Sequence, residues 1–375
     1  MSIQQTLAQL VAIDSVSSRS NKGIVDYLEQ RCLKLGLSPQ RYSYFDEFGI
    51  EKINLVALSH PLGAEDWVEL ALVGHTDTVP YDAGWTEATT LVERDDKLYA
   101  RGACDTKGFI ACALNAVERF EVSRLKQPLA LIFTADEEGG LVGAKQFAKL
   151  KLFKVRFSIV GEPTSLQPIR AGKGYAIAEI LVRGHEAHSA YPALGSSAIF
   201  RAARLISRIE KIGEQIRGSQ HSAFDPPFST LNVGLIKGGS AKNVIPGECR
   251  FTLEWRLLPG QASTFVLNLI HEAIQVEKQL DPAFDCEVDA NRSDSGFETP
   301  TDSRLVSFLE KSSGMKSGTV SFGTEAAEMR RLGGDAVVLG PGDIRVAHRT
   351  GEFVPRKDLE RCTDILVGAI NEFCC

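Results

Sequence analysis

The chain has 375 residues and a mass of 40.9 kDa, too long for one hydrophobic core, so two or three domains are predicted. Hydrophobic residues make up 43% and charged residues 24% of the chain, a balance that excludes a disordered or fibrous protein. The formal net charge of −6 provides no broad basic surface, and no apolar run approaches the ~18 residues that span a bilayer. We therefore expect no nucleic-acid partner and no membrane.

The N-terminal stretch and the cysteines indicate the compartment. The stretch MSIQQTLAQLVAIDS lacks a basic region and a cleavage site, so no signal peptide is predicted. The eight cysteines contain no C-x-x-C pair and no regular spacing. A reduced, cytoplasmic location is expected.

The first part of the chain alternates predicted helices and strands. Several strands are apolar on both faces, which is typical of a largely parallel sheet covered on both sides. The expected elements, in chain order, are a helix at 21–35, strands at 52–59 and 67–74, a helix at 106–121, a strand at 128–135, a helix at 141–150 and a strand at 157–161.

After Gly172 the pattern changes to half-exposed strands and long amphipathic helices. The predicted order is strand 175–184, helix 196–216, strands 228–236 and 248–257, helix 261–280 and strand 283–289. This order fits a small sheet with two helices on one face. A polar loop is expected at 290–300, followed by a helix at 302–313, a strand at 335–339 and a helix at 356–372. The chain is thus predicted to form a discontinuous α/β domain (1–171 and 290–375) with an inserted α+β domain (172–289).

Rare polar residues follow the predicted buried strands. Acidic or imidazole groups come directly after the strands at 67–74, 128–135 and 157–161, and ligands bind at the carboxyl ends of strands in open α/β sheets. A further acid precedes the helix at 106–121, and a histidine follows the strand at 335–339. These residues are His75, Asp77, Asp105, Glu137, Glu138, Glu162 and His348.

Carboxylates gathered at one edge repel one another unless a cation is present, so we predict a pair of divalent metal ions. Two sites bridged by one carboxylate need one imidazole and one further carboxylate each. The available ligands are His75, His348, Asp105, Glu138 and Glu162. Mixed nitrogen and oxygen ligands favour Zn²⁺, with Co²⁺ or Mn²⁺ as substitutes. Glu137 is left over as a general base, and Asp77 can orient His75.

Each of these patterns has a simpler explanation when taken alone. A single His-x-Asp occurs by chance, Glu137 and Glu138 could cap a helix, and Glu162 before Pro163 could form a turn. The prediction of a metal site depends on several strand ends carrying ligand types together.

Eight segments, in order, resemble the dinuclear zinc amidohydrolases that include acetylornithine deacetylase, succinyl-diaminopimelate desuccinylase, aminoacylase and glutamate carboxypeptidase. The segments are GHTDTVP (74–80), LYARGACDTKG (98–108), TADEEGG (134–140), VGEPTSLQPIRAGKG (160–174), VRGHEAHSAYPALGSSAI (182–199), GGSAKNVIP (238–246), VSFGTEAAEMRRLG (320–333) and VVLGPGDIRVAHRTGEFVP (337–355). The resemblance implies a zinc-peptidase-like catalytic domain and an inserted lid and dimerisation domain.

The resemblance also implies how the ligands pair. His75 and Glu162 would hold one metal, Glu138 and His348 the other, and Asp105 would bridge them. The resemblance also implies that Glu137 is the general base and that Asp77 orients His75.

For the inserted domain the resemblance implies a homodimer in which His188 reaches the partner's active site and polarises the scissile carbonyl oxygen. Without it, His188 would be a surface-loop histidine. It further implies that Asn243 and Arg256 bind the substrate carboxylate, although Arg256 could be one more arginine at a strand end. Gly323 and Thr324 would approach the substrate through backbone groups.

The implied reaction is metal-dependent hydrolysis of an N-acyl amino acid, with N2-acetyl-L-ornithine in arginine biosynthesis as the first choice. Glu325 could attract the cationic end of ornithine, or could simply open a helix near the metals. The alternatives are deacetylation of N-acetylcitrulline, N-acetyl-lysine or a carrier-linked amino acid, desuccinylation of succinyl-diaminopimelate, and a carboxypeptidase or dipeptidase of the same fold. A non-catalytic paralogue is disfavoured because every expected ligand and Glu137 are present.

Overall fold

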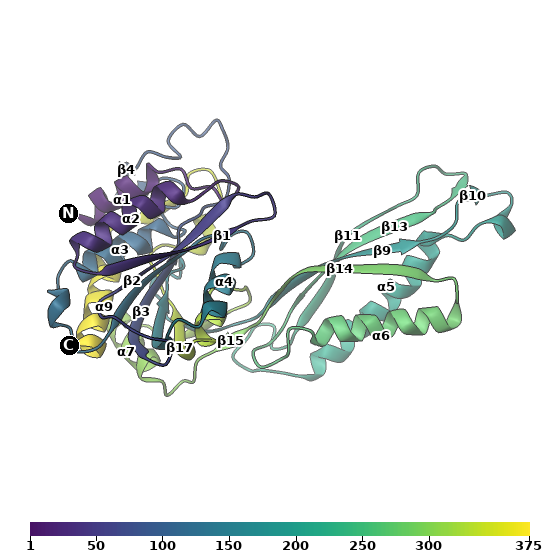
Figure 1. Cartoon of the computed structure of the whole chain (residues 1–375). Coiled ribbons are helices and arrows are strands. Elements are labelled where there is room, and N and C mark those ends of the chain that lie inside the picture. Colours follow the sequence, from purple (N-terminus) through teal and green to yellow (C-terminus); the bar gives the residue numbers. More distant parts are fainter. The chain divides into compact units, whose positions relative to one another are not determined.

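The computed structural model describes residues 1–290 and 292–375 and divides into two compact units. The first unit comprises 1–170, 298–318 and 324–375, and the second comprises 171–297 and 319–323. The predicted insert, 172–289, is shorter than the second unit at both ends. Figure 1 shows the helices and strands of both units.

The sheet of the first unit has the order β1-β2-β6-β3-β7-β17-β8-β15, with β16 paired to β8. β6, β3, β7 and β17 run parallel, whereas β1, β2 and β8 pair antiparallel with their neighbours. The predicted α/β fold with a mainly parallel mixed sheet is therefore confirmed. The strands are β1 (Ser38–Phe45), β2 (Glu51–Leu58), β3 (Trp67–His75), β6 (Leu129–Thr134), β7 (Lys154–Val160), β8 (Ile169–Gly172), β15 (Phe297–Glu298), β16 (Gly318–Val320) and β17 (Gly333–Val338).

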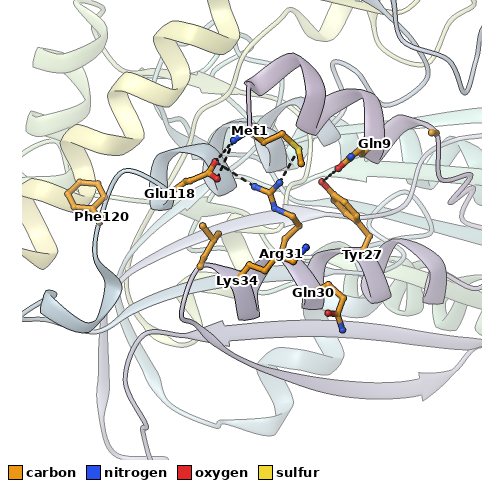
Figure 2. Close-up of a pocket in the computed structure, with 10 residues that line it drawn as sticks. Met1, Gln9, Tyr27, Gln30, Arg31, Lys34, Glu118 and Phe120 are labelled. Atoms are coloured by element: carbon orange, nitrogen blue, oxygen red, sulfur yellow. Dashed lines mark hydrogen bonds and ion pairs between the residues drawn. The ribbon is translucent and has the colours of Figure 1, made fainter.

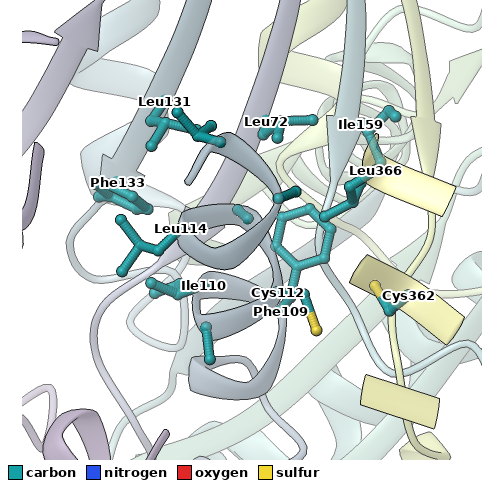
Figure 3. Packing of buried hydrophobic residues seen from close by; sticks show 14 of the residues in the cluster. Leu72, Phe109, Ile110, Cys112, Leu114, Leu131, Phe133, Ile159, Cys362 and Leu366 are labelled. Atoms are coloured by element: carbon teal, nitrogen blue, oxygen red, sulfur yellow. The ribbon is translucent and has the colours of Figure 1, made fainter. Parts of the chain in front are cut away.

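Helices cover both faces of this sheet. α1 (Ile3–Val11), α2 (Lys22–Lys34), α3 (Lys107–Val117), α7 (Arg304–Ser313) and α9 (Arg356–Cys374) share one hydrophobic core with the strands, while α4 (Val142–Leu150) and α8 (Ala326–Arg330) contact each other and the sheet. Figure 3 shows α3 at the centre of the core, with Phe109 and Leu114 packed among strand and α9 side chains. The contact is so close that a Cβ on Gly161 would lie 2.2 Å from the Phe109 ring. α3 is thereby fixed against the strand ends.

A small sheet and short turns complete the secondary structure of the described residues. The sheet has the order β18-β5-β4, from β4 (Val92–Arg94), β5 (Lys97–Tyr99) and β18 (Phe353–Pro355). The 3₁₀ turns are Val122–Arg124, Pro192–Leu194, Ile216–Gly218 and Ile344–Val346. Every helix in the described part of the chain is too short or too polar to cross a bilayer.

The second unit has a four-stranded sheet in the order β11-β13-β9-β14, with α5 (Ala198–Gln215) and α6 (Phe265–Leu280) packed on one face. Its strands are β9 (Tyr175–Arg183), β11 (Thr230–Gly238), β13 (Glu248–Arg256) and β14 (Asp285–Asp294). A separate pair, β10 (Ala187–His188) with β12 (Val244–Ile245), lies at one end of these strands (Figure 1). The predicted four strands and two helices are confirmed.

The predicted polar loop at 290–300 is wrong in part, because β14 runs to Asp294 and β15 covers Phe297–Glu298. After a bulge that follows Asp289, β14 pairs again with β9, with Arg292 opposite Ile177. Strand pairing thus overrides the polar composition. The helix α1 and the edge strand β1 were not predicted, since the polar sequence SPQRYSYF of β1 gives no strand signal of its own.

Candidate metal centre

The predicted ligands of the first unit meet at one edge of its sheet. Because β3, β6 and β7 run parallel, their carboxyl ends lie together. His75 is the last residue of β3, Glu138 follows the end of β6 by four residues, and Glu162 follows the end of β7 by two. All three side chains therefore approach one another at this edge.

Asp105 lies between the two histidines. Its Oδ1 is 3.0 Å from His75 Nε2 and its Oδ2 is 3.1 Å from His348 Nε2. His348 Nε2 also lies 2.9 Å from Glu138 Oε1. Asp105 is buried, and each of its oxygens contacts one of the two histidines.

Two groups of side chains have donor atoms that all lie within 4.8 Å of one another and share Asp105. The groups are His75 with Asp105 and Glu162, and Asp105 with Glu138 and His348. A third such group joins His75, Glu137 and Glu138. The structure thus brings all five predicted ligands and the predicted base into one cluster, which can bind divalent metal.

The nitrogen and oxygen atoms of the cluster are arranged to bind a cation and not to hydrogen-bond one another. His75 Nδ1 lies 3.0 Å from the backbone oxygen of Asp77, an acceptor that requires the ring proton to be on Nδ1. The Nε2 lone pair of a neutral His75 then faces a carboxylate oxygen of Asp105. Two lone pairs at 3.0 Å need a positive charge between them, and Zn²⁺ and related ions bind such nitrogen and oxygen atoms at about 2.0–2.2 Å.

The crowded acids shift the pKa values around them. Burial raises the pKa of Glu162 well above its usual value, and the negative charge of Asp105 adds to the effect. Burial likewise raises the pKa of Glu137, despite the opposing influence of His75. Contacts with Asp105 and Glu138 raise the pKa of His348 to about 10. The cluster therefore attracts protons when it lacks another cation, which is the behaviour of a metal site.

Asp77 stabilises the cluster in more ways than predicted. Its backbone oxygen is the closest acceptor for His75 Nδ1, since the carboxylate oxygen Oδ1 lies 3.6 Å away. The carboxylate instead accepts hydrogen bonds from the backbone amides of Glu137 and Glu138, at 3.1 and 3.2 Å, and from the Ser17 hydroxyl at 2.7 Å. Asp77 therefore ties the strand end that carries His75 to the loop that carries Glu137.

Sequence reasoning assigned no role to Glu352, which is fully buried beside Asp105. One of its oxygens accepts from the amides of Cys104 and Asp105, at 2.9 and 3.1 Å, and the other accepts from Arg101 at 2.6 Å. Glu352 thus fixes the loop that presents Asp105. The one signal for Glu352 in the sequence was its place in the segment RTGEFVP. That segment resembles the dinuclear zinc amidohydrolases, but the resemblance assigned Glu352 no function.

The helix-capping explanation for the paired glutamates does not apply. α4 begins at Val142 with Leu141 as its N-cap and has no side-chain cap, so Glu137 and Glu138 lie outside the helix.

Thr324 and Glu325 also belong to the first unit. Glu325 is fully buried, one of its oxygens accepts from the Thr134 hydroxyl, and burial raises its pKa to about 7.

The predicted substrate residues of the second unit fall into two places. His188 pairs with Val244, and the amide of Ser189 donates to the backbone oxygen of Asn243 at 3.0 Å, so His188 and Asn243 are neighbours. Arg256 instead ends β13, the strand that follows β12. The nine residues of β13 span roughly 27 Å at about 3.4 Å per residue, which separates Arg256 from His188 and Asn243.

At the opposite end of β13, the His188 ring has a defined tautomer. The amide of Ala190 donates to His188 Nδ1 at 3.1 Å, so a neutral ring carries its proton on Nε2. Gly323 lies close to Tyr175 at the Arg256 end, since a Cβ added to Gly323 would be 3.7 Å from Tyr175 Cβ. The predicted contacts thus belong to two separate surfaces of the second unit.

A pocket of about 750 Å³ in the first unit contains none of the predicted site residues. Figure 2 shows Arg31 and Glu118 beside Met1, with Tyr27 donating to Gln9 at 2.8 Å. Arg31 lies 3.7 Å from Glu118. This pocket is lined by α1, α2 and the end of α3, and not by the strand ends.

Comparison with known proteins agrees with this geometry. The chain is 51% identical over 373 residues to an acetylornithine deacetylase of Myxococcus xanthus, covering 99% of this chain and 97% of that protein. It is 38% identical over 308 residues to an acetylornithine deacetylase of Salmonella typhimurium, covering 81% and 80%. The fold matches an M20 family metallo-carboxypeptidase of Sulfolobus solfataricus with a TM-score of 0.79 at 19% identity, covering 100% and 99%. Residues 71–372 match Peptidase family M20/M25/M40, and the chain belongs to this family.

Proposed function

We propose that this metal-dependent amidohydrolase removes the acyl group from an N-acyl amino acid, with N2-acetyl-L-ornithine as the preferred substrate. The observation that carries the proposal is the pair of ligand groups that share Asp105, next to Glu137. The 51% identity to an acetylornithine deacetylase, over nearly the whole chain, supports the choice of substrate. The product, ornithine, would serve arginine biosynthesis in the cytoplasm.

Two zinc ions suit the donor set, because imidazole nitrogen and carboxylate oxygen are both common zinc ligands. We assign His75 and Glu162 to one ion, Glu138 and His348 to the other, and Asp105 to both. When bound, such ions supply Lewis-acid activation of water and of the acyl carbonyl. Co²⁺ or Mn²⁺ could substitute for zinc.

Glu137 is assigned as the general base. It is the carboxylate of the cluster that this assignment leaves free of metal, and Asp77 holds its backbone amide at 3.1 Å. In the proposed reaction a carboxylate oxygen of Glu137 takes a proton from the attacking water and then gives it to the leaving amine. Asp77 positions both His75 and the Glu137 loop for this step.

The substrate carboxylate is assigned to Arg256, whose planar guanidinium matches a carboxylate. His188 and Asn243 lie at the other end of β13. The second unit of a single chain therefore does not bring Arg256, His188 and Asn243 to one small substrate. A second copy of the chain can supply His188 and Asn243 to the site. His188 would then donate its Nε2–H to the carbonyl oxygen as negative charge develops there.

The surface of the second unit supports a dimer. β11 is an edge strand, and its Leu235 and Ile236 are 70% and 58% exposed. On α5, Phe200 is 72% exposed and Ile199 lies against Gly238 of β11. An exposed, apolar edge strand next to an exposed aromatic ring is a surface that a second copy can cover by strand pairing.

Glu325 and the backbone of Gly323 and Thr324 are assigned to the rest of the substrate. Glu325 is fully buried and its Oε2 has no hydrogen-bond partner within the described ranges, so we assign this unsatisfied carboxylate oxygen to the cationic end of ornithine. A comparison of N-acetylornithine with neutral N-acetylcitrulline tests this assignment. An equal or higher kcat/KM for the citrulline compound would remove the electrostatic role of Glu325.

The proposed function is tested by a hydrolysis panel with zinc-reconstituted protein. The panel contains N2-acetylornithine, N-acetylcitrulline, N-acetyl-lysine, succinyl-diaminopimelate and two dipeptides, each with and without a chelator. We expect the highest kcat/KM for N2-acetylornithine, and loss of that activity with the chelator. A higher kcat/KM for a dipeptide would assign the protein to the peptidases of this fold instead.

A further inference from the structure

Arg256 has a partner residue that the sequence did not indicate. Tyr175 is the first residue of β9, and the register places it beside Arg256 of β13 and diagonally across from Arg292 of β14. The Cζ atoms of Arg256 and Arg292 lie 4.7 and 4.9 Å from the centroid of the Tyr175 ring. Two guanidinium groups from neighbouring strands therefore contact one aromatic ring.

These three residues lie on the sheet face that the helices leave open. Ala176 and Ala178 of β9 point into the core beneath α5 and α6, so Tyr175 points to the opposite face. Successive side chains of a strand point to opposite faces of the sheet. By the strand register, Arg256 and Arg292 point to the same face as Tyr175. All three side chains are half-buried.

The two arginines differ in how fully they are neutralised. Arg292 Nε donates to Asp294 at 2.6 Å, and the Asp294 side chain is only 1% exposed, which makes this a short ion pair with a buried carboxylate. Arg256 instead donates from Nη1 to the backbone oxygen of Ser321 at 2.9 Å, and its Nε lies 3.7 Å from the half-exposed Glu254. The charge of Arg256 is therefore less fully neutralised than that of Arg292, which makes Arg256 the better partner for an incoming carboxylate.

We propose that Tyr175 is a positioning residue that holds the Arg256 guanidinium in the orientation that receives the substrate carboxylate. The Arg292–Asp294 ion pair fixes the ring from the β14 side. Contact with an aromatic face restricts the rotamers of a long, flexible arginine side chain without neutralising its charge. The N–H groups in the guanidinium plane stay free to donate hydrogen bonds. This inference rests on the proposed role of Arg256 in carboxylate binding.

The test compares Tyr175→Leu with Tyr175→Phe in the full-length, zinc-loaded protein, using N2-acetylornithine. Tyr175→Leu should raise KM by roughly 3- to 30-fold with little change in kcat, because the ring contact acts on substrate binding. Tyr175→Phe keeps the ring and should restore KM to near the wild-type value. Thermal denaturation of both variants provides the check on folding, and equal melting temperatures are expected.

The same substitutions in an Arg256→Ala background separate this inference from the proposed function. If Tyr175 acts through Arg256, Tyr175→Leu should raise KM no further once Arg256 is absent. An undiminished effect of Tyr175→Leu in that background, or a wild-type KM for Tyr175→Leu alone, overturns the positioning role while the carboxylate role of Arg256 remains. A wild-type KM for Arg256→Ala overturns the carboxylate role itself, and the inference with it.

Discussion

The two units present their proposed site residues in opposite ways. In the first unit, residues distant in sequence converge at one sheet edge, and Asp105 contacts both histidines, at 3.0 and 3.1 Å. In the second unit, His188 and Arg256 lie at the two ends of one strand system, separated by the length of β13. The first unit contains a complete cluster, whereas the second distributes its contributions over two surfaces.

The difference follows from the topology of the two sheets. Parallel strands joined by helices bring all their carboxyl ends to one edge, so a single chain can assemble many ligands there. The antiparallel sheet of the second unit sends alternate strands to opposite ends. Residues at both ends can act on one small substrate when different copies of the chain provide them.

The largest expected effect is at Glu137. Glu137→Gln should retain the wild-type metal content and lower kcat by about 10²–10⁴-fold, because the proton acceptor is lost while the assigned ligands remain. Metal analysis of the purified variant and steady-state kinetics measure the two quantities. Glu121→Gln, at an exposed surface ion pair, is the control and should behave as wild type. Near-normal kcat in metal-loaded Glu137→Gln would reject the base assignment.

Glu352 should affect metal binding rather than the chemical step. Glu352→Gln weakens the hydrogen bonds to the Asp105 loop and to Arg101, so we expect the affinity for zinc to fall by about 10–100-fold. Competition with a chelator measures that affinity, and Glu360→Gln, exposed on α9, serves as the control. An unchanged zinc affinity would show that Asp105 does not depend on this support.

A smaller effect, on stability alone, is expected at Glu277 in the second unit. Its buried carboxylate accepts from Arg204 and Arg208, so Glu277→Gln should lower the free energy of unfolding by about 1–2 kcal/mol without changing zinc affinity. Urea denaturation measures the loss, with exposed Glu272→Gln of the same helix as the control. A loss of zinc affinity in Glu277→Gln would contradict a role that is confined to stability.

The pH dependence of this effect has a defined sign. Burial raises the pKa of Glu277, but the two arginines outweigh it, and the net pKa lies below the usual value. A depressed pKa in the folded state contributes stability above the unfolded pKa of about 4.3, and this contribution disappears as the pH falls through the folded value. The difference between wild type and Glu277→Gln should therefore be larger at pH 7 than at pH 3.

The sequence predicted the first unit's site more completely than the second's. Apolar strands followed by acids or histidine predicted that His75, Glu138 and Glu162 lie together, because the carboxyl ends of parallel strands meet at one edge. Glu352 and the carboxylate contacts of Asp77 depend on which loops pack together, and local pattern carries no such information. The extension of β14 to Asp294 was missed because pairing with β9 stabilises a strand whose residues are polar.

In the second unit, the sequence pattern predicted the strands and helices, but it did not predict the distance between His188 and Arg256. The resemblance assigned Asn243 and Arg256 to one carboxylate, and only the course of β13 separates them. Tyr175 had no sequence signal at all, since its partners come from β13 and β14, some 80 and 117 residues further along the chain. Such contacts between strands arise from register rather than from spacing.

Complementation between two inactive variants tests most directly whether the sites are shared between copies. His188→Ala and Glu137→Gln are purified separately, mixed in equal amounts, unfolded and refolded together, and assayed with N2-acetylornithine. If His188 acts on the partner's site, mixed dimers contain one intact site, and random pairing should restore about a quarter of the wild-type activity. Activity that stays at the average of the two variants would contradict the shared site and place His188 outside the reaction or within its own subunit's site.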